Sequence, residues 1–312
     1  MKDLYQREID YMRISVTDRC NLRCRYCMPY DLSLLPQHDI LSYEEILFIC
    51  EVAAQNGIRH LKVTGGEPLV RKGCTDFIGV LKKVPGIEHV TLTTNGVLLK
   101  EVLPALAETK VDGINISLDT LDSQMYRNIT GRNKFHKVWE ALLKAIEMGF
   151  SVKINCVPVK GYNEEDCLSL VRLAETYPVD IRFIEMMPIG YGKDFTPVNS
   201  NEIWNRILSK YSDLRESEKK RGFGPAHYYT GESLKGSVGF IEAMNHKFCS
   251  KCNRIRLTAD GYLKTCLYYK NGFNLKKAIR GGASREDIAS MFLEALKDKP
   301  REHHFEEEKE GQ

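Results

Sequence analysis

Residues 11–185 alternate short runs of β-branched and aromatic residues with longer segments in which apolar residues recur at helical spacing. The runs predict strands at 11–17, 60–64, 89–93, 113–118, 152–157 and 180–185. Helices are expected at 75–84, 98–108, 135–148 and 164–176. A further helix should begin after Ser42, which forms a capping-box pattern with Glu45, and should end at Asn56-Gly57.

About six strand–helix alternations with short connections are typical of a parallel sheet. We therefore expect an α/β fold built on a curled, partial (β/α)6 barrel of the TIM type. In such sheets the residues that bind ligands gather at the carboxyl ends of the strands. Functional side chains are expected at that end.

The pattern changes after Glu185, where loops become longer and strands shorter. We expect a helix at 202–211, strands at 227–229, 239–242 and 254–258, and a final helix at 284–296. This change predicts two domains, a barrel over residues 10–185 and a smaller α+β domain over residues 186–312. The acidic run at 306–310 is expected to be solvated or disordered.

Cys20, Cys24 and Cys27 follow the first predicted strand with the spacing C-x3-C-x2-C. A structural zinc site and an ordinary iron–sulfur cluster each take four protein ligands, so three thiolates leave one position open. The spacing suggests a cubane iron–sulfur cluster held at three corners, whose fourth iron can bind another ligand. The alternative is a zinc ion that these cysteines share with a distant His or Cys.

The amino-acid composition and net charge exclude only a few classes of protein. The 312 residues include 45 Lys and Arg against 42 Asp and Glu, and a net charge of +3 does not indicate binding to nucleic acid or a membrane surface. No segment approaches a membrane span, and the charged amino end lacks the apolar stretch of a signal peptide. We therefore expect a cytoplasmic protein, in which the ten cysteines are not disulfides. Those outside the two clustered sets are interpreted as packing residues, namely Cys50, Cys74, Cys156 and Cys167.

A second cysteine set, Cys249, Cys252 and Cys266, has the spacing C-x2-C-x13-C and again lacks an obvious fourth ligand. Two incomplete sites are difficult to explain as structural zinc sites, because each needs a ligand from outside the chain. Arg254 and Arg256 alternate along the predicted strand between these cysteines, so their side chains point to the same side. Two guanidinium groups beside a metal site suit a phosphate.

Several motifs extend this picture along most of the chain. They are the first cysteine motif from Arg13, Thr64-Gly65-Gly66-Glu67-Pro68-Leu69, Thr93-Thr94-Asn95-Gly96, Ile116-Ser117-Leu118-Asp119, Arg182-Phe183-Ile184-Glu185, 223–228, and the second cysteine segment to Gly261. Together they resemble the MoaA family of GTP 3′,8-cyclases, radical S-adenosylmethionine (SAM) enzymes of molybdenum-cofactor biosynthesis, from about residue 4 to about residue 300. The first cysteine motif alone would indicate a radical SAM enzyme, and the second set with its arginines narrows the family.

The resemblance implies two [4Fe-4S] clusters, one on Cys20, Cys24 and Cys27 that binds SAM, and one on Cys249, Cys252 and Cys266 that binds the guanine of GTP. The implied SAM contacts are Tyr26, Gly66, Ser117 and Met187. The implied GTP contacts are Arg13, Lys62, Thr93, Lys153, Arg254, Ile255 and Arg256. No catalytic residue is implied beyond the clusters and SAM.

The implied reaction converts GTP to (8S)-3′,8-cyclo-7,8-dihydroguanosine 5′-triphosphate, the first step of molybdopterin formation. In the family a 5′-deoxyadenosyl radical removes hydrogen from C3′ of GTP, and the resulting carbon radical adds to C8. The implied partners are an electron donor and the cyclic pyranopterin monophosphate synthase that receives the product, and the family is compatible with a homodimer. Nucleic-acid and membrane partners are not expected.

The carboxyl end departs from the family, whose members finish with Gly-Gly, whereas this sequence ends with Gly311-Gln312 after an acidic run. We expect such an end to keep SAM and GTP binding while impairing cyclisation. His303-His304 is interpreted as a surface pair. Two alternatives stay open, a radical SAM peptide or protein maturase with an auxiliary cluster, and a non-catalytic module that binds a metal cluster.

Overall fold

The computed structural model describes residues 1–28, 33–244, 247–269 and 272–304 and contains a 12-stranded sheet. The strands are β1 (Tyr11–Ser15), β2 (His60–Thr64), β3 (His89–Thr94), β4 (Gly113–Ser117), β5 (Val152–Cys156), β6 (Asp180–Ile184), β7 (Arg215–Glu216), β8 (His227–Thr230), β9 (Ser237–Ile241), β10 (Arg254–Leu257), β11 (Tyr262–Lys264) and β12 (Phe273–Asn274). Their order is β12-β11-β10-β1-β2-β3-β4-β5-β6-β9-β8-β7.

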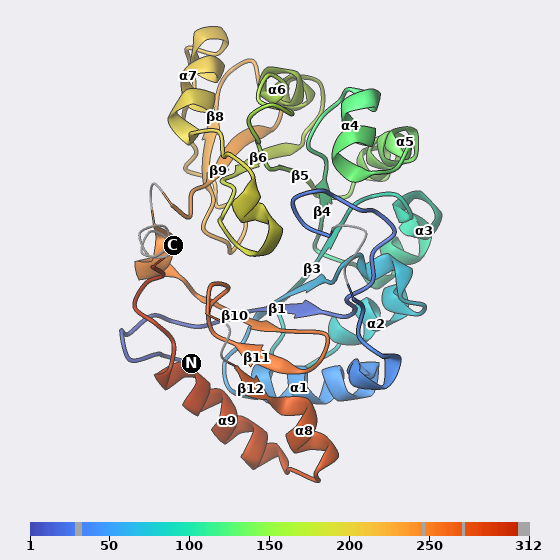
Figure 1. Cartoon of the computed structure of the whole chain (residues 1–312), viewed down its shortest axis with the longest axis vertical. Coiled ribbons are helices and arrows are strands. Elements are labelled where there is room, and N and C mark those ends of the chain that lie inside the picture. Colours follow the sequence, from blue (N-terminus) through green and yellow to red (C-terminus); the bar gives the residue numbers. More distant parts are fainter. Residues whose placement is uncertain (29–32, 245–246, 270–271, 305–312) are drawn as a thin grey trace.

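Helices connect the parallel strands and lie on the outside of the sheet (Figure 1). The α-helices are α1 (Tyr43–Gln55), α2 (Cys74–Leu81), α3 (Leu99–Thr109), α4 (Ser123–Thr130), α5 (Phe135–Glu147), α6 (Cys167–Thr176), α7 (Ser200–Lys210), α8 (Leu275–Arg280) and α9 (Arg285–Lys297). Strands β1 to β6 pair in chain order and in parallel, which confirms the predicted α/β alternation. Among the described residues, no helix combines the length and apolarity that crossing a membrane requires.

The carboxy-terminal part of the chain extends both edges of this sheet. Strand β10 pairs in parallel with β1, and β9 pairs in parallel with β6, so the two later strands flank the six earlier ones. Antiparallel strands follow on each side, β11 and β12 beyond β10, and β8 and β7 beyond β9. Helix α9 packs against α1, which ties the end of the described chain to its beginning (Figure 1).

The two faces of the sheet have opposite chemistry because alternate side chains on a strand point to opposite faces. On β1 and β2 the outward positions are apolar and buried under the helices, as in Ile14 and Val63. The inward positions on the same strands carry polar and charged groups, including Arg13, His60 and Lys62. The outer face therefore makes the hydrophobic core, and the inner face encloses a polar cavity.

Local signals explain most element ends. The Ser42 hydroxyl accepts a hydrogen bond from the Glu45 backbone N–H, and the Glu45 carboxylate accepts one from the Ser42 N–H, so the predicted capping box starts α1. The chain leaves α1 through Gly57, whose φ of 102° suits glycine. Helix α4 was not predicted, although Asp122 caps it by accepting a hydrogen bond from the Met125 N–H.

Candidate active site

The first cysteine loop follows β1 directly and is fastened by its backbone. The N–H groups of Arg23 and Arg25 donate to the carbonyl oxygens of Thr130 and Ile129, at 2.9 and 3.0 Å, which holds the loop against the end of α4. Cys20 and Cys24 are half-buried, whereas Cys27 is exposed. The sequence therefore places three thiols at the carboxyl end of β1, where ligand-binding groups of parallel sheets gather.

The Gly65-Gly66 turn after β2 lies against the backbone that leads into this loop. The Gly66 N–H donates to the Thr17 carbonyl at 2.7 Å, and the next N–H donates to the Arg19 carbonyl, also at 2.7 Å. A Cβ on Gly66 would overlap the Arg19 carbonyl and would lie 2.7 Å from the carbonyl oxygen of Asp18. Glycine is required here because two backbone segments meet, in addition to any ligand that approaches the turn.

Glu67 connects this turn to the cysteines through β3. Its buried carboxylate accepts hydrogen bonds from the Thr94 hydroxyl at 2.8 Å and from the Asn95 backbone N–H at 2.6 Å. The Asn95 side-chain amide then donates to the Asn21 side chain at 2.7 Å and lies 3.7 Å from the sulfur of Cys20. This network orients Asn95 toward the thiol, a role that the sequence motifs alone did not assign.

The four residues implied as SAM contacts lie at or beyond the carboxyl ends of strands. Ser117 is the exposed last residue of β4, Met187 follows β6, and Tyr26 lies within the cysteine loop. The Tyr26 hydroxyl donates to Asp119 at 2.5 Å, and the Val157 N–H donates to the same carboxylate at 2.9 Å. Burial raises the pKa of Asp119 to about 6, although these two hydrogen bonds favour its ionised form.

The first cysteine set has the electrostatics of a site for a cationic centre. Burial raises the pKa values of Cys20, Cys24 and Cys27. The negative charges of neighbouring thiolates raise those of Cys24 and Cys27 further, and the charge of Glu67 raises that of Cys20. Asp119 adds a negative charge near Cys24 and Cys27. A metal centre would relieve this crowding, because coordination deprotonates a thiol and compensates its charge.

The spacing of the sulfur atoms bears on which metal centre fits. Among the described residues, neither cysteine set gathers its three sulfur atoms within 4.8 Å of one another. Thiolates on one tetrahedral zinc ion lie about 3.8 Å apart, as Zn–S bonds of about 2.3 Å require. Thiolates at the corners of a cubane cluster lie farther apart, so the donor type and spacing fit an iron–sulfur cluster better than a single zinc ion.

The second cysteine set lies before β10 and after β11. Cys249 lies within the short 3-10 turn Phe248–Lys251, Cys252 follows that turn, and Cys266 follows β11. The side chain of Lys299, which is only 3% exposed, lies 3.7 Å from the sulfur of Cys252. Burial favours the neutral thiol, but the charges of Lys299 and Arg254 outweigh it and lower the pKa of Cys252 to about 7.

Two further buried residues fasten the chain around this set. Arg7 donates to the Cys249 carbonyl at 2.7 Å and to the carbonyls of Pro300 and Arg301 at 2.6 and 3.0 Å. His303 is 6% exposed, and the Ala243 carbonyl accepts a hydrogen bond from its Nε2 at 2.7 Å. The interpretation of His303 as a surface residue is therefore wrong, since the segment that carries it packs beside the second cysteine set. The acidic run at 306–310 lies outside the described residues.

A cavity of about 520 Å³ lies on the inner face of the sheet and is lined by cations from several strands. Because residues of β10 and β8, far apart in the strand order, line the same cavity, the sheet curls around it. The basic side chains that line it on the strands are Arg13, Lys62, Lys153, Arg182 and Arg254, and Thr93 lines it as well. Arg256 lies next to Arg13 in the β1–β10 register, and Ile255 is fully buried on the opposite, outer face of the sheet.

The positive charges that line the cavity repel one another, which destabilises the charged form of Lys62. Burial lowers the pKa of Lys62 well below its ordinary value, and the positive charges of Arg182, Arg13, Lys153 and Arg254 lower it further. The Nε atoms of Arg13 and Arg254 are buried without a hydrogen-bond partner among the described residues. Concentrated, incompletely paired positive charge of this kind suits a polyanionic ligand.

Arg182 also lines the cavity, although the sequence motifs did not assign it a role. Its Nε donates to the Asn155 side-chain oxygen at 2.8 Å, and its Nη2 donates to that of Asn115. The alternation of side chains along β6 could have identified Arg182, because Asp180, Arg182 and Ile184 all face the cavity. Neutral amide acceptors orient the guanidinium without neutralising it, so its charge remains available to a ligand.

The segment 219–226 lines the cavity near the amino-terminal ends of the strands. The Phe223 ring stacks on His60 with ring centres 3.6 Å apart, and Arg221 pairs with Asp180 at 2.7 Å. Asp180 also pairs with Lys153 at 2.8 Å.

The four cysteines assigned to packing, Cys50, Cys74, Cys156 and Cys167, are buried as predicted.

Comparisons with known proteins agree with this arrangement. Residues 14–174 match the model of the Radical SAM superfamily, and residues 179–305 match that of Molybdenum Cofactor Synthesis C. The GTP 3′,8-cyclase of Clostridium perfringens (strain SM101 / Type A) is 43% identical over 306 residues, 98% of this chain and 95% of that protein. The GTP 3′,8-cyclase of Moorella thermoacetica is 44% identical over 317 residues, 98% of this chain and 96% of that protein.

Among solved structures, Streptococcus suis SuiB bound to S-adenosylmethionine has the same fold, with a TM-score of 0.64 and 17% identity over 92% of this chain and 66% of SuiB. At this identity the likeness concerns the fold alone. The family matches and the two cyclases cover nearly the whole sequence, and the cysteine motifs fall within the matched segments. The chain belongs to the GTP 3′,8-cyclase family of the radical SAM superfamily.

Proposed function

We propose that this protein is a GTP 3′,8-cyclase that catalyses the first step of molybdenum-cofactor biosynthesis. The observation that carries the proposal is the cationic cavity, whose lining includes residues close in sequence to contacts of each cysteine set. Thr93 lines the cavity two residues before Asn95, which reaches Cys20, and Arg254 lines it two residues after Cys252. A ligand with a triphosphate and a base can therefore lie in the cavity and extend toward both sets.

Cys20, Cys24 and Cys27 would hold the [4Fe-4S] cluster that the superfamily carries, and Cys249, Cys252 and Cys266 would hold a second [4Fe-4S] cluster. When bound, the first cluster and SAM supply one-electron reductive cleavage that starts radical chemistry at the substrate. Tyr26, Gly66, Ser117 and Met187 would line the SAM side. Their place at the carboxyl ends of the strands supports that role.

The role of the cavity residues is binding and placement. Arg13, Lys62, Lys153, Arg254 and Arg256 would neutralise the triphosphate, with Thr93 and the backbone at Ile255 beside them. We add Arg182 to this set because its guanidinium is held by two amides and faces the cavity. Fixing the phosphates positions the ribose and excludes water, which decides which hydrogen a radical can reach.

The remaining assignments belong to the same proposal. The barrel would comprise residues 10–185, and residues 186–312 would form the domain that carries the second cluster. An electron donor would reduce the first cluster, and cyclic pyranopterin monophosphate synthase would receive the product. A cytoplasmic location and a homodimer are compatible with this role.

Two other functions would use the same cysteines differently. A peptide maturase needs a groove that accepts a polypeptide, whereas the cavity here concentrates positive charge in a volume of about 520 Å³. A non-catalytic cluster module would not need this cavity. The cavity therefore favours a small polyanionic substrate.

The proposal is tested by anaerobic reaction of the cluster-loaded protein with SAM, GTP and dithionite, with mass spectrometry and chromatography of the nucleotides. The expected result is 5′-deoxyadenosine together with a cyclised isomer of GTP. Cys266→Ala should abolish the cyclised product, and the matched variant Cys167→Ala should not, since Cys167 is a buried residue of α6. Deoxyadenosine without any cyclised nucleotide from the parent protein would contradict the proposal.

A further inference from the structure

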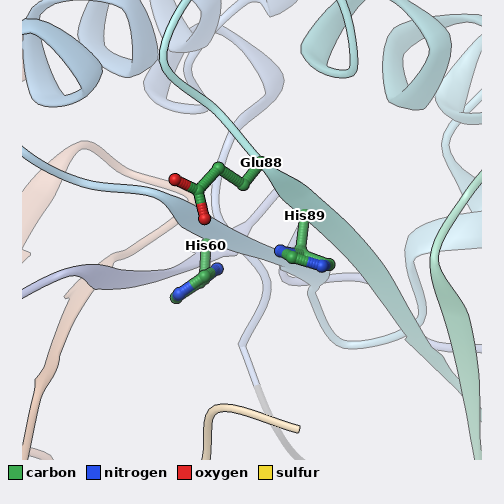
Figure 2. Close-up of side chains that lie close together, drawn as sticks. All are labelled: His60, Glu88 and His89. Atoms are coloured by element: carbon green, nitrogen blue, oxygen red, sulfur yellow. The ribbon is translucent and has the colours of Figure 1, made fainter.

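A cluster of two histidines and a glutamate lies at the amino-terminal ends of β2 and β3, the opposite end from the cysteine loop. His60 and His89 are the first residues of neighbouring parallel strands and are direct partners in their register. Glu88 immediately precedes β3, and Figure 2 shows the three side chains lying close together. Among the described residues, these three are the one group of His, Cys, Asp or Glu whose ligand atoms all lie within 4.8 Å of one another.

The unsatisfied histidine nitrogens are a second, independent observation. The Nδ1 atoms of His60 and His89 are both buried, and neither has a hydrogen-bond partner among the described residues. His60 is only 5% exposed, so water does not readily replace the missing partner. A buried imidazole nitrogen without a partner is costly in free energy, and a bound metal ion would satisfy it.

The Nε2 atom of His60 lies near a carboxylate that could orient the ring. Its Nε2 lies 3.7 Å from an Asp10 carboxylate oxygen, and the other Asp10 oxygen accepts a hydrogen bond from the Asn253 side chain at 2.7 Å. This resembles the carboxylate–histidine–metal arrangement, in which the carboxylate fixes the ring orientation and makes the ligating nitrogen more basic. Because Nε2 faces Asp10, Nδ1 is the nitrogen of His60 that can bind the metal ion.

The ring of Phe223 packs against both imidazoles. Phe223 stacks on His60 with an angle of 17° between the rings and lies 4.5 Å from the His89 ring centre. Stacking on the ring face leaves the nitrogen lone pairs, which lie in the ring plane, free for coordination. Glu88 makes an exposed ion pair with Arg59 at 3.9 Å, which is weak enough to be replaced by a metal bond.

We propose that His60, Glu88 and His89 form a binding site for a borderline divalent cation of the Zn²⁺ type. Two imidazoles and one carboxylate are a common ligand set for such ions, and three protein ligands leave one position for water. The carboxylates of Glu88 and Asp10 balance the charge of the ion. The guanidinium of Arg59, which pairs with Glu88, and the ammonium of Lys220, 4.7 Å from the Phe223 ring centre, are nearby positive charges. His60 and His89 also line the cationic cavity, at the amino-terminal ends of the strands. The site uses none of the six cysteines, so zinc binding there can be measured without assaying the proposed cyclase activity.

The test is zinc binding by the full-length protein after both cysteine sets have been loaded with iron, so that thiolates do not compete. Zinc and iron per chain are measured after equilibrium dialysis against Zn²⁺, and zinc X-ray absorption reports the ligand atoms. We expect one zinc ion per chain with nitrogen and oxygen neighbours and imidazole scattering. Zinc–sulfur scattering, or no zinc retained at intact iron content, would overturn the proposal.

Variants separate this site from general surface binding. Glu88→Gln and His89→Gln should weaken zinc binding by about 100-fold, and Asp10→Asn by about 10-fold, because it acts through His60. Glu88 is exposed, so its variant should fold normally. The matched control is His136→Gln, which breaks a surface His–Glu pair at 2.6 Å that has no third ligand. Unchanged zinc affinity in Glu88→Gln would overturn the assignment.

Discussion

The ammonium group of Lys299 lies 3.7 Å from the sulfur of Cys252, and the same group donates to the carbonyls of Arg254 and Thr265 at 2.9 and 2.6 Å. A buried cation thus faces a thiol of the second set from a segment more than forty residues later in the chain. Hydrogen bonds and charges beside cluster thiolates tune both the affinity and the potential of a cluster.

We therefore predict that Lys299→Met makes the second cluster labile. Loss of the charge removes the main cause that lowers the pKa of Cys252, and iron release to a chelator should become about 10-fold faster. The control is Lys297→Met, an exposed lysine at the end of α9. Iron release and the cluster potential are measured in the same samples, and equal rates in the two variants would disprove the role.

Arg182 provides a test of the cavity as a polyanion site. Arg182→Met removes a charged donor and leaves the side-chain oxygens of Asn115 and Asn155 without their partner. Hydrogen bonds to charged groups contribute about 1.5–3 kcal/mol, so GTP should bind about 10- to 100-fold more weakly. Binding is measured by equilibrium dialysis, with the exposed Arg172→Met as control. Wild-type affinity in Arg182→Met would exclude contact with the nucleotide.

Gly66 tests whether the turn after β2 supports the first cysteine loop. Gly66→Ala places a Cβ against the Arg19 carbonyl, and overpacking of this kind costs about 1–3 kcal/mol. We expect a lower Tm and reduced iron on the first cysteine set. Gly224→Ala is the control, since a Cβ there meets no atom within 4 Å. A Gly66→Ala protein with full iron content and unchanged Tm would show that the contact is unimportant.

Asp119 predicts a defined pH dependence. Burial raises its pKa from 3.8 to about 6, so ionised Asp119 costs about 3 kcal/mol of stability at neutral pH. Between these pKa values the folded protein holds the proton and the unfolded chain does not, so this residue makes stability fall as pH rises from about 4 to about 6. Asp119→Asn keeps an acceptor for Tyr26 and removes the charge.

The Asp119→Asn variant should therefore be the more stable protein at pH 7, and its advantage should shrink by about 1 kcal/mol at pH 5. Denaturant unfolding at the two pH values measures the difference. Asp122→Asn, an exposed position near Asp119, serves as the control. A wild-type protein that equals or exceeds Asp119→Asn in stability at pH 7 would contradict the assigned burial cost.

The sequence pattern predicted the fold well where apolar periodicity was strong. Strand β2 has the predicted bounds, and β1 to β6 all form, because each outward apolar set packs under helices. The pattern missed the short helices α4 and α8 and the short strands β7, β11 and β12, whose few residues carry too little periodicity to separate them from loops. It also could not show that β9 and β10 join opposite edges of one sheet, since pairing between distant segments leaves no local signal.

Motif spacing located the cysteine sets and most of the cavity cations but not their supporting residues. Lys299 and His303 act through contacts with segments distant in sequence, so neither belongs to a local motif. The motif Arg182-Phe183-Ile184-Glu185 did not reveal a role for Arg182, because the orientation of its guanidinium depends on side-chain amides from two other strands. His60 and His89 became a pair only through the register of β2 and β3.

The most direct test of the central claim uses GTP that carries deuterium at C3′, with SAM and dithionite under anaerobic conditions. A bond between C3′ and C8 requires loss of the hydrogen from C3′, so the account predicts deuterium in the 5′-deoxyadenosine together with a cyclised nucleotide. Deoxyadenosine without deuterium, with GTP recovered unchanged, would show that the cavity does not present C3′ of GTP to the radical chemistry and would contradict the proposed cyclase.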